Sequence, residues 1–365
     1  MDTRYAKPTD SQLVPTMRIG CEEKGLMTIT VLQSLSPPDG TTRYVNQVVE
    51  GAPDEVCTRF FTWRTALIGR YDVLHVHWPE LLIRAPKPLK ARLRRGALYV
   101  LLARTKLLRI PIVRTMHNLT PHEAGATAET RALDALDKRT TLVIRLNPPT
   151  PILPESRAVT ILHGHYRDRF SSTPLPAVVF GRLLYFGLIR PYKGVETLLQ
   201  AFQSLPGDDL ALRIVGRPSS GLGEVITEAE THDSRISSAL RFVSDVELVS
   251  EVGGAELVVL PYREMHNSGV LLVALSLDRP VLVPSTPSNL ALASEVGPDW
   301  IYLYEGELTP EILRQTLEQI RAAGRHARPR LDDRDWKTLG EQSYRAYLRA
   351  LQQTGRRVRA QRRLR

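Results

Sequence analysis

Two patterns of apolar residues alternate along the whole chain. One is a short continuous apolar run, and the other is a stretch with apolar residues three and four positions apart. The first pattern predicts buried strands, and the second predicts amphipathic helices. In the first half of the chain the expected strands are 28–33, 56–63, 73–77, 112–117, 141–146 and 159–162. In the second half they are 183–186, 212–215, 240–243, 257–260, 281–283 and 300–303. Strands that alternate with helices in this way predict an α/β fold with parallel sheets.

The length of the chain, 365 residues, predicts two domains, because single cores stop growing below that size. Residues 171–176, Ser-Ser-Thr-Pro-Leu-Pro, have the composition of a linker and lie between the two alternating halves. We therefore predict a disordered extension at 1–26, a first Rossmann-like domain at 27–170, a linker at 171–180, a second Rossmann-like domain at 181–330, a C-terminal helix at 331–352 and a basic tail at 353–365. The sequence leaves open whether Met1 or Met27 is the native start.

An anion site is predicted where the apolar run 257–261 ends. Asn267, Ser268 and Gly269 come shortly after this run and open a nearly all-apolar segment with the length of a helix. The first turn of a helix has backbone N–H groups without partners and the positive end of the macrodipole, and Gly269 has no side chain to block a close approach. A diphosphate would fit this junction. Simple capping of the helix by Asn267 and Ser268 is the alternative.

A second cationic element follows the expected strand 183–186. Gly187, Arg190 and Lys193 lie on the loop at its carboxyl end, and an amphipathic helix comes next. Open α/β sheets bind their ligands at this edge, so we expect Arg190 and Lys193 to face the same phosphates as Ser268. A solvated turn lysine and a salt-bridged arginine are the structural alternatives.

These two stretches resemble those of a known enzyme family. The segment 187–202 is similar to the motif that opens the second domain of GT-B glycosyltransferases, above all those of glycosyltransferase family 4, and 257–284 is similar to their donor diphosphate loop and helix. The Glu-x7-Glu pair of family 4 is missing, because Met265 and Val273 occupy its positions. Leu188 stands where that family usually has Arg.

A narrower resemblance comes from Asn267-Ser268-Gly269 together with the segment 76–80, Val-His-Trp-Pro-Glu. Both are similar to a bacterial branch that includes GDP-mannose:glycolipid β-mannosyltransferases of exopolysaccharide synthesis. The resemblance implies two Rossmann-like domains that face each other across a cleft, with a C-terminal helix that returns to the first domain. It also implies a nucleotide-sugar donor, best matched by GDP-mannose, and a glycolipid or oligosaccharide acceptor. No cofactor and no metal are expected.

The acceptor side of such an enzyme is expected at the strand ends of the first domain. An inverting sugar transfer needs a base that takes a proton from the acceptor hydroxyl, and His117 is the favoured base, with Glu123 or Glu80 as an alternative carboxylate. His77 and Trp78 suit sugar contact and stacking. The remaining acceptor-side candidates are Thr41, Arg43, His163 and His165. For each histidine a structural hydrogen-bonding role is the alternative.

The formal charge of +10 is concentrated in two segments. Residues 84–114 contain ten Lys or Arg and no acid, and residues 351–365 contain six Arg and no acid. Within 84–114 the basic residues alternate with apolar ones at helical spacing, which predicts a basic amphipathic helix able to bind an anionic membrane surface. An ordinary solvated helix is the alternative. Nucleic acid is not an expected partner, because the motifs and interleaved aromatic residues of nucleic-acid-binding patches are absent.

Composition predicts a protein without a membrane span. The chain is 42% hydrophobic and 24% charged, and no apolar run approaches the roughly 18 residues needed to cross a bilayer. Cys21 and Cys57 have no metal-ligand spacing and are expected to be free thiols in a reducing compartment. The expected location is therefore the cytoplasm, with peripheral attachment to the inner face of the cell membrane if the basic helix binds lipid.

Two other functions fit the same residues. A nucleotide-sugar epimerase of the GT-B architecture would share the diphosphate cleft, and a non-catalytic sugar- or lipid-binding protein would explain the missing glutamate pair. A Rossmann dehydrogenase is not expected, because no GxGxxG motif follows the first strand. The sequence decides neither the stereochemistry of transfer nor the oligomeric state.

Overall fold

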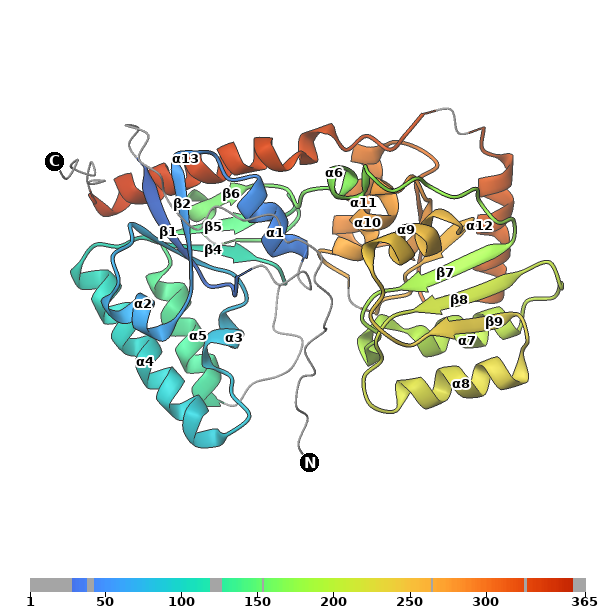
Figure 1. Cartoon of the computed structure of the whole chain (residues 1–365), viewed down its shortest axis with the longest axis horizontal. Coiled ribbons are helices and arrows are strands. Elements are labelled where there is room, and N and C mark those ends of the chain that lie inside the picture. The colour runs from blue at the N-terminus through green and yellow to red at the C-terminus, as the bar shows by residue number, and fades with distance from the viewer. Residues whose placement is uncertain are drawn as a thin grey trace.

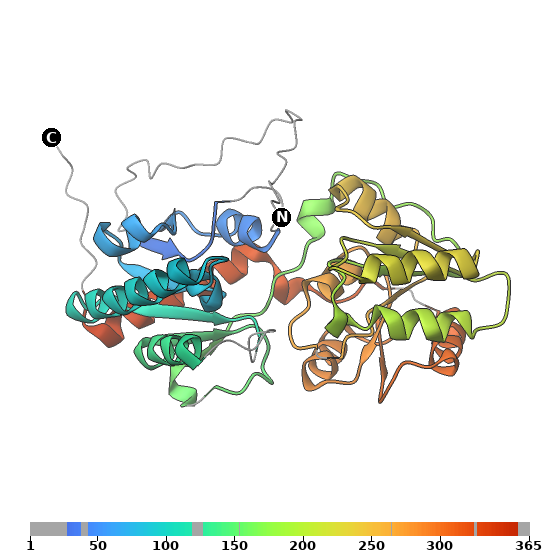
Figure 2. The same ribbon diagram turned by 90° about the horizontal axis from the view of Figure 1, so that it is seen from below.

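The computed structural model of the protein describes residues 28–37, 43–118, 127–152, 154–263, 265–324 and 327–356. These residues form two six-stranded parallel sheets, each covered by helices, that lie side by side (Figures 1 and 2). The predicted α/β fold with two Rossmann-like domains is confirmed. The predicted extension at 1–26 and most of the basic tail lie outside the described residues.

The first domain contains β1 to β6 and the helices between them. Its elements are β1 (Ile29–Gln33), α1 (Arg43–Glu50), β2 (Val56–Phe60), α2 (Trp63–Ile68), β3 (Val73–Val76), α3 (Pro79–Ile83), α4 (Pro88–Leu107), β4 (Ile112–Met116), α5 (Thr127–Arg139), β5 (Leu142–Arg145) and β6 (Ala158–Thr160). The short helix α6 (Arg167–Phe170) follows β6 and packs on the second domain, where Phe170 is buried in the core. The strand order is β2-β1-β3-β4-β5-β6, so the direction of winding switches between β1 and β3. Ligands of open α/β sheets bind outside the carboxyl ends of the strands at such a switch point.

The second domain repeats the scheme. Its elements are β7 (Arg182–Phe186), α7 (Val195–Gln203), β8 (Ala211–Val215), α8 (Leu222–His232), β9 (Ile236–Ala239), α9 (Asp245–Gly253), β10 (Leu257–Val259), α10 (Gly269–Ser276), β11 (Val281–Pro284), α11 (Pro287–Val296), β12 (Ile301–Tyr304) and α12 (Pro310–Ala322). The order β12-β11-β10-β7-β8-β9 puts the switch point between β7 and β10. The two loops with anion-binding character follow these two strands.

Two predicted strands are placed differently in the structure. The strand expected at 56–63 ends earlier, because the Thr62 hydroxyl accepts a hydrogen bond from the Thr65 amide and so caps α2. The prediction of a strand at 240–243 is wrong. β9 ends at Ala239, which pairs with Val215 of β8, and the apolar residues that follow include Phe242 with 60% exposure.

The last helix, α13 (Trp336–Thr354), packs on the first domain, as Figure 1 shows. Trp336, Leu339 and Tyr347 are buried in one cluster with Ile29 and Val31 of β1. Asp335 starts the helix by accepting a hydrogen bond from the Thr338 amide. The predicted return of the C-terminal helix is therefore confirmed, and the chain crosses between the domains twice.

Close packing of α13 makes Gly340 sensitive to substitution. A Cβ atom at Gly340 would lie 1.8 Å from the carbonyl oxygen of Gly51, so the backbones must separate to admit it. We expect Gly340→Ala to lower the free energy of unfolding by about 1–3 kcal/mol, measured by denaturant titration. Gly96→Ala on α4 is the control, since nothing lies within 4 Å of the added atom, and it should stabilise the helix by roughly 0.5–1 kcal/mol. Equal effects of the two changes would contradict this packing.

Three expectations from composition can be compared with the described residues. Cys57 on β2 is disulfide-bonded, so the prediction of a free thiol is wrong for Cys57, while Cys21 lies outside the described residues. None of the described helices is long and apolar enough to cross a membrane. Within the same residues, no group of three or more His, Cys, Asp or Glu is placed to hold a metal ion.

Candidate active site

The loops that follow β7 and β10 open onto a cavity between the two domains. This interdomain cavity has a volume of about 620 Å³. The first domain lines it with Asn118, Pro149 and Pro151, and the second lines it with residues that include Tyr192, Lys193, Tyr262, Met265, His266, Asn267, Ser268 and Gly269. The predicted cleft between facing domains is thus present, at the carboxyl edge where a ligand is expected.

Lys193 brings an ammonium group to this cavity although its side chain is buried, with 8% exposure. Its Nζ lies 4.7 Å from the centre of the Tyr262 ring, and no carboxylate among the described residues pairs with it. Burial and the neighbouring charge of Arg190 lower the pKa of Lys193 to about 8. The alternative of a solvated turn lysine is therefore wrong. A buried charge without a partner is costly, so this site suits an anionic ligand.

Gly187 allows the two loops to meet at the cavity. Its φ of 110° favours glycine, and a Cβ there would lie 3.0 Å from Val270 Cγ2 in the first turn of α10 and 3.9 Å from Lys193 Nζ. Arg190 is not among the residues that line the cavity, because its Nη1 donates to the Ile189 carbonyl at 3.0 Å. The structure thus brings Lys193 and α10 together at the cavity, and Arg190 does not line it.

The first turn of α10 is capped by Ser268 and also faces the interdomain cavity. Ser268 Oγ accepts a hydrogen bond of 3.2 Å from the Leu271 amide, so Ser268 caps the helix. Ser268, Gly269 and Val270 all line the interdomain cavity. The amides of Gly269 and Val270 have no partner within the helix, which leaves them for an anion in the cavity.

Asn267 joins the two domains instead of capping α10. Its Nδ2 donates to the His117 carbonyl at 2.9 Å, and its Oδ1 accepts from Asn147 Nδ2 at 2.5 Å. Next to it, His266 Nε2 lies 2.8 Å from Thr150 Oγ1. The loop before α10, which the resemblance makes the donor loop, is therefore tied to the first domain beside His117, and the side chain of Asn267 is occupied by these bonds.

A chain of hydrogen bonds leads inward from His117. His117 Nε2 lies 3.1 Å from His77 Nδ1, and His77 Nε2 lies 2.9 Å from Gln33 Oε1. Because the amide oxygen of Gln33 can only accept, His77 carries its proton on Nε2 and accepts from His117 through Nδ1. His117 then carries its own proton on Nε2. Its Nδ1, which bonds to no described residue, presents a lone pair.

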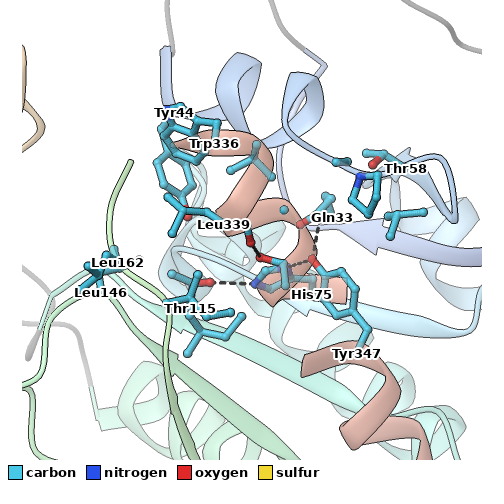
Figure 3. Close-up of a pocket in the computed structure, with 18 residues that line it drawn as sticks. Gln33, Tyr44, Thr58, His75, Thr115, Leu146, Leu162, Trp336, Leu339 and Tyr347 are labelled. Atoms are coloured by element: carbon cyan, nitrogen blue, oxygen red, sulfur yellow. Dashed lines mark hydrogen bonds between the residues drawn. The ribbon is translucent and has the colours of Figure 1, made fainter. Parts of the chain in front are cut away.

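The inner end of this chain is held by α13 (Figure 3). Gln33 Nε2 donates to the Tyr347 hydroxyl at 3.3 Å, and that hydroxyl lies 2.8 Å from His75 Nδ1. His75 Nε2 lies 2.8 Å from Thr115 Oγ1. These groups border a small cavity of about 40 Å³ between the sheet and α13. Burial lowers the pKa of His75 to about 3, so the network is neutral.

His117 has the properties of a neutral base beside an aromatic surface. Its half-buried ring stacks on Trp78 with centroids 4.1 Å apart and an interplanar angle of 18°, and Tyr44 meets it edge-on at 4.9 Å. Burial, followed by the charges of His163, His75 and Arg114, lowers the pKa of His117 well below its usual value. The imidazole is therefore unprotonated at neutral pH and can accept a proton.

Of the three other predicted acceptor-side histidines, two lie away from the interdomain cavity and one approaches it. His77 is fully buried, so the prediction that it contacts sugar is wrong, and it supports His117 instead. His165 is also placed away from both cavities, because its Nδ1 accepts from the Arg167 amide and its carbonyl accepts from Trp336 Nε1. His163 does approach the donor loop, since a Cβ on Gly269 would lie 3.7 Å from its Nε2.

The remaining candidates lie either away from the interdomain cavity or outside the described residues. Glu80 is the second residue of α3 and does not line the interdomain cavity. Thr41 and Glu123 lie outside the described residues. Arg43 is the first residue of α1, and its side chain is outside the description.

Sequence reasoning missed the residues that hold the site together. Gln33 stands at the carboxyl end of the first strand, a position that already indicates a site residue. Asn147 and Tyr347 carried no such signal, because their partners are 120 and 314 residues away in the chain.

Two Rossmann-like domains that face each other across a cavity, with a buried lysine on one side and a neutral histidine on the other, are typical of a GT-B glycosyltransferase. The comparisons agree. The chain is 48% identical over 329 residues to a GDP-mannose:glycolipid 4-β-D-mannosyltransferase of Xanthomonas campestris pathovar campestris, with 90% of this chain and 94% of that protein covered. The chain therefore belongs to this family of glycosyltransferases.

Other comparisons support the same class and fold. Residues 181–319 match the family model of glycosyl transferases group 1. The structure of Anabaena HepE in complex with UDP has a TM-score of 0.56 at 14% identity, with 90% of this chain and 98% of that chain covered. A glycosyltransferase of Rickettsia africae has a TM-score of 0.55 at 13% identity, with 90% and 96% covered. At such identities these two structures share the fold with this chain.

Proposed function

We propose that this glycosyltransferase transfers mannose from GDP-mannose to a glycolipid acceptor. The observation that carries the proposal is Lys193, a buried ammonium without an acidic partner among the described residues, beside the open first turn of α10. The similarity to the Xanthomonas enzyme supports the choice of donor and acceptor. The comparisons favour neither the epimerase nor the non-catalytic alternative.

The proposed chemistry is a single displacement. The bond between the sugar C1 and the diphosphate oxygen breaks, and a bond from the acceptor hydroxyl oxygen to C1 forms. The leaving diphosphate gains charge, which Lys193 and the amides of α10 neutralise. The proton of the acceptor hydroxyl passes to His117 Nδ1. Such a step needs one base and no cofactor, and it inverts the anomeric configuration.

The test of this function is transfer and binding by purified protein. We expect radiolabelled mannose to pass from GDP-mannose to a lipid-linked oligosaccharide, and GDP to raise the melting temperature because it binds only the folded form. UDP and UDP-glucose serve as controls and should give smaller shifts. Transfer from UDP-sugars with none from GDP-mannose would contradict the donor. An epimerised sugar formed without acceptor would contradict the transferase reaction.

Helix α4 offers a surface for the membrane that carries a glycolipid. Its solvent-facing stripe contains Leu89, Leu93, Val100 and Leu107, which are 68%, 67%, 59% and 83% exposed. Exposed basic side chains, among them Lys90 and Arg92, flank this stripe. Exposed apolar residues beside cations are typical of helices that lie in a lipid interface. Attachment of α4 to anionic lipid on the cytoplasmic side of the membrane is part of this proposal.

Vesicle sedimentation can test the role of α4. We expect the variant with both Lys90→Glu and Arg92→Glu to bind phosphatidylglycerol vesicles about thirtyfold more weakly, since each basic residue near the surface contributes about 1 kcal/mol. Lys337→Glu changes an exposed lysine on α13 and should leave binding nearly unchanged. Equal losses in the two proteins would show that net charge, and not this helix face, attracts the membrane.

A further inference from the structure

A third cavity lies in the first domain beside Trp78. It has a volume of about 360 Å³, within the range of small-molecule sites. Its walls come from the loops after β1, β2 and β3 and from α4. Six of its lining residues carry the argument: Ser34, Ser36, Phe61, Trp63, Trp78 and Arg94. We call it the aromatic cavity.

Topology makes this cavity a natural ligand site. The winding of the first sheet switches between β1 and β3, and the aromatic cavity is bounded by the loops that follow these two strands. Backbone loops diverge at a switch point and leave a crevice beyond the carboxyl ends of the strands. The first domain thus has its own crevice, separate from the interdomain cavity that suits the donor.

The lining of the aromatic cavity fits a carbohydrate. Phe61 and Trp63 meet edge to face at 5.2 Å, and Trp78 lines the same space. Flat rings contact the apolar faces of pyranose sugars, while serine hydroxyls and Arg94 can bond to sugar hydroxyls. No acidic residue occurs among its described lining residues, and Arg94 is the single cation among them. The lining of the aromatic cavity therefore suits an uncharged saccharide.

Trp78 connects this cavity to the proposed base. Its ring stacks on His117 and also lines the aromatic cavity, so one side chain borders both the base and this space. On the outer side, Arg94 belongs to α4, and the lining residue Leu81 is 63% exposed near that helix. The aromatic cavity therefore lies between Trp78, the ring stacked on His117, and helix α4.

We propose that the aromatic cavity binds the sugar rings of the acceptor glycolipid that precede the ring receiving the new sugar, an inference that rests on the proposed function. The lipid end of the acceptor then lies toward α4, and the accepting hydroxyl lies at His117. Trp63 is the residue to change in a test of this cavity. It contacts neither His117 nor the donor loop in any described contact, so its substitution leaves the base and the donor site unchanged.

Binding of soluble saccharides tests this assignment without requiring transfer. We expect cellobiose and β-1,4-mannobiose to give saturation-transfer signals with the wild type in nuclear magnetic resonance, and Trp63→Ala to weaken their binding about tenfold. Trp63→Phe keeps an aromatic face and should bind nearly as the wild type does. Phe180→Ala removes an exposed aromatic side chain from the second domain and is the matched control. The melting-temperature shift with GDP should persist in all three variants, since the donor loops are unchanged.

A blocking variant covers the case in which Trp63→Ala does not fold. Ser36 is exposed at the cavity, so Ser36→Trp can fill the space without disturbing the core, and it should abolish saccharide binding. Absence of saccharide binding to the wild type would overturn the inference. Binding to Ser36→Trp as strong as to the wild type would also overturn it.

Mannose transfer by the same proteins separates this inference from the proposed function. If both hold, Trp63→Ala raises KM for the glycolipid about tenfold and leaves KM for GDP-mannose unchanged. Transfer with an unchanged KM for the glycolipid overturns the role of the aromatic cavity alone. No transfer by a wild type that binds saccharides through Trp63 overturns the proposed function alone.

Discussion

Lys193→Met should lower kcat/KM for the nucleotide sugar by about 10²- to 10³-fold and remove the melting-temperature shift with GDP. The same change should raise the melting temperature of the ligand-free protein. Burial holds the pKa of Lys193 near 8, well below its ordinary value, so keeping the ammonium charged in the folded state costs about 3 kcal/mol at neutral pH. Methionine fills similar space without that cost. Differential scanning fluorimetry with and without GDP measures both effects.

The pH dependence of Lys193 provides the control. Because the lysine loses its charge as pH rises through about 8, affinity for GDP in the wild type should be full below that pH and fall above it. Lys193→Arg keeps a charge that titrates far higher, so its remaining affinity should not fall in this range. If Lys193→Met keeps the melting-temperature shift with GDP unchanged, Lys193 has no role in donor binding and the assignment is wrong.

His117→Ala should lower kcat by about 10²- to 10⁴-fold while leaving the GDP-induced shift in place. The variant removes the group that accepts the proton of the acceptor hydroxyl and leaves Lys193 and α10 unchanged. Because the pKa of His117 is held well below 6.5, protonation of this residue should not reduce wild-type activity between pH 8 and 6.5. Rates of mannose transfer under saturating substrates, measured across this pH range, provide the check.

Two further variants sharpen the test of His117. Gln33→Leu removes the acceptor that fixes the proton of His77 on Nε2, so kcat should fall by a smaller factor and the acid limb of the pH profile should move. His232→Gln alters an exposed histidine on α8 and should change nothing. Full activity of His117→Ala would show that a group other than His117 is the base.

Much of the donor side could be predicted from local sequence. The loop with Gly187 and Lys193 and the helix that starts at Gly269 each follow an apolar strand, and in a parallel sheet such ends meet at one edge. Arg190 does not line the cavity, and Asn267 does not cap α10, which was the structural alternative for this residue. Both differences concern where a side chain points, which hydrogen-bond partners decide. Those partners are the Ile189 carbonyl for Arg190 and the first domain for Asn267.

The acceptor side was harder to read because its histidines look alike in sequence. His77 and His117 both end strands, yet one is fully buried and the other is half-buried beside Trp78. Side chains from other strands and from α13 produce this difference. Periodicity along one strand contains no information about them.

The sequence by itself determined the α/β alternation, the two halves and the position of the two loops that we propose bind the diphosphate, because strand, helix and turn preferences are local properties of the chain. Tertiary structure alone decided that Lys193 is buried without an acid among the described residues and that Tyr347 of α13 closes the network behind His117. Burial and hydrogen bonding depend on segments hundreds of residues apart, and only folding brings these together.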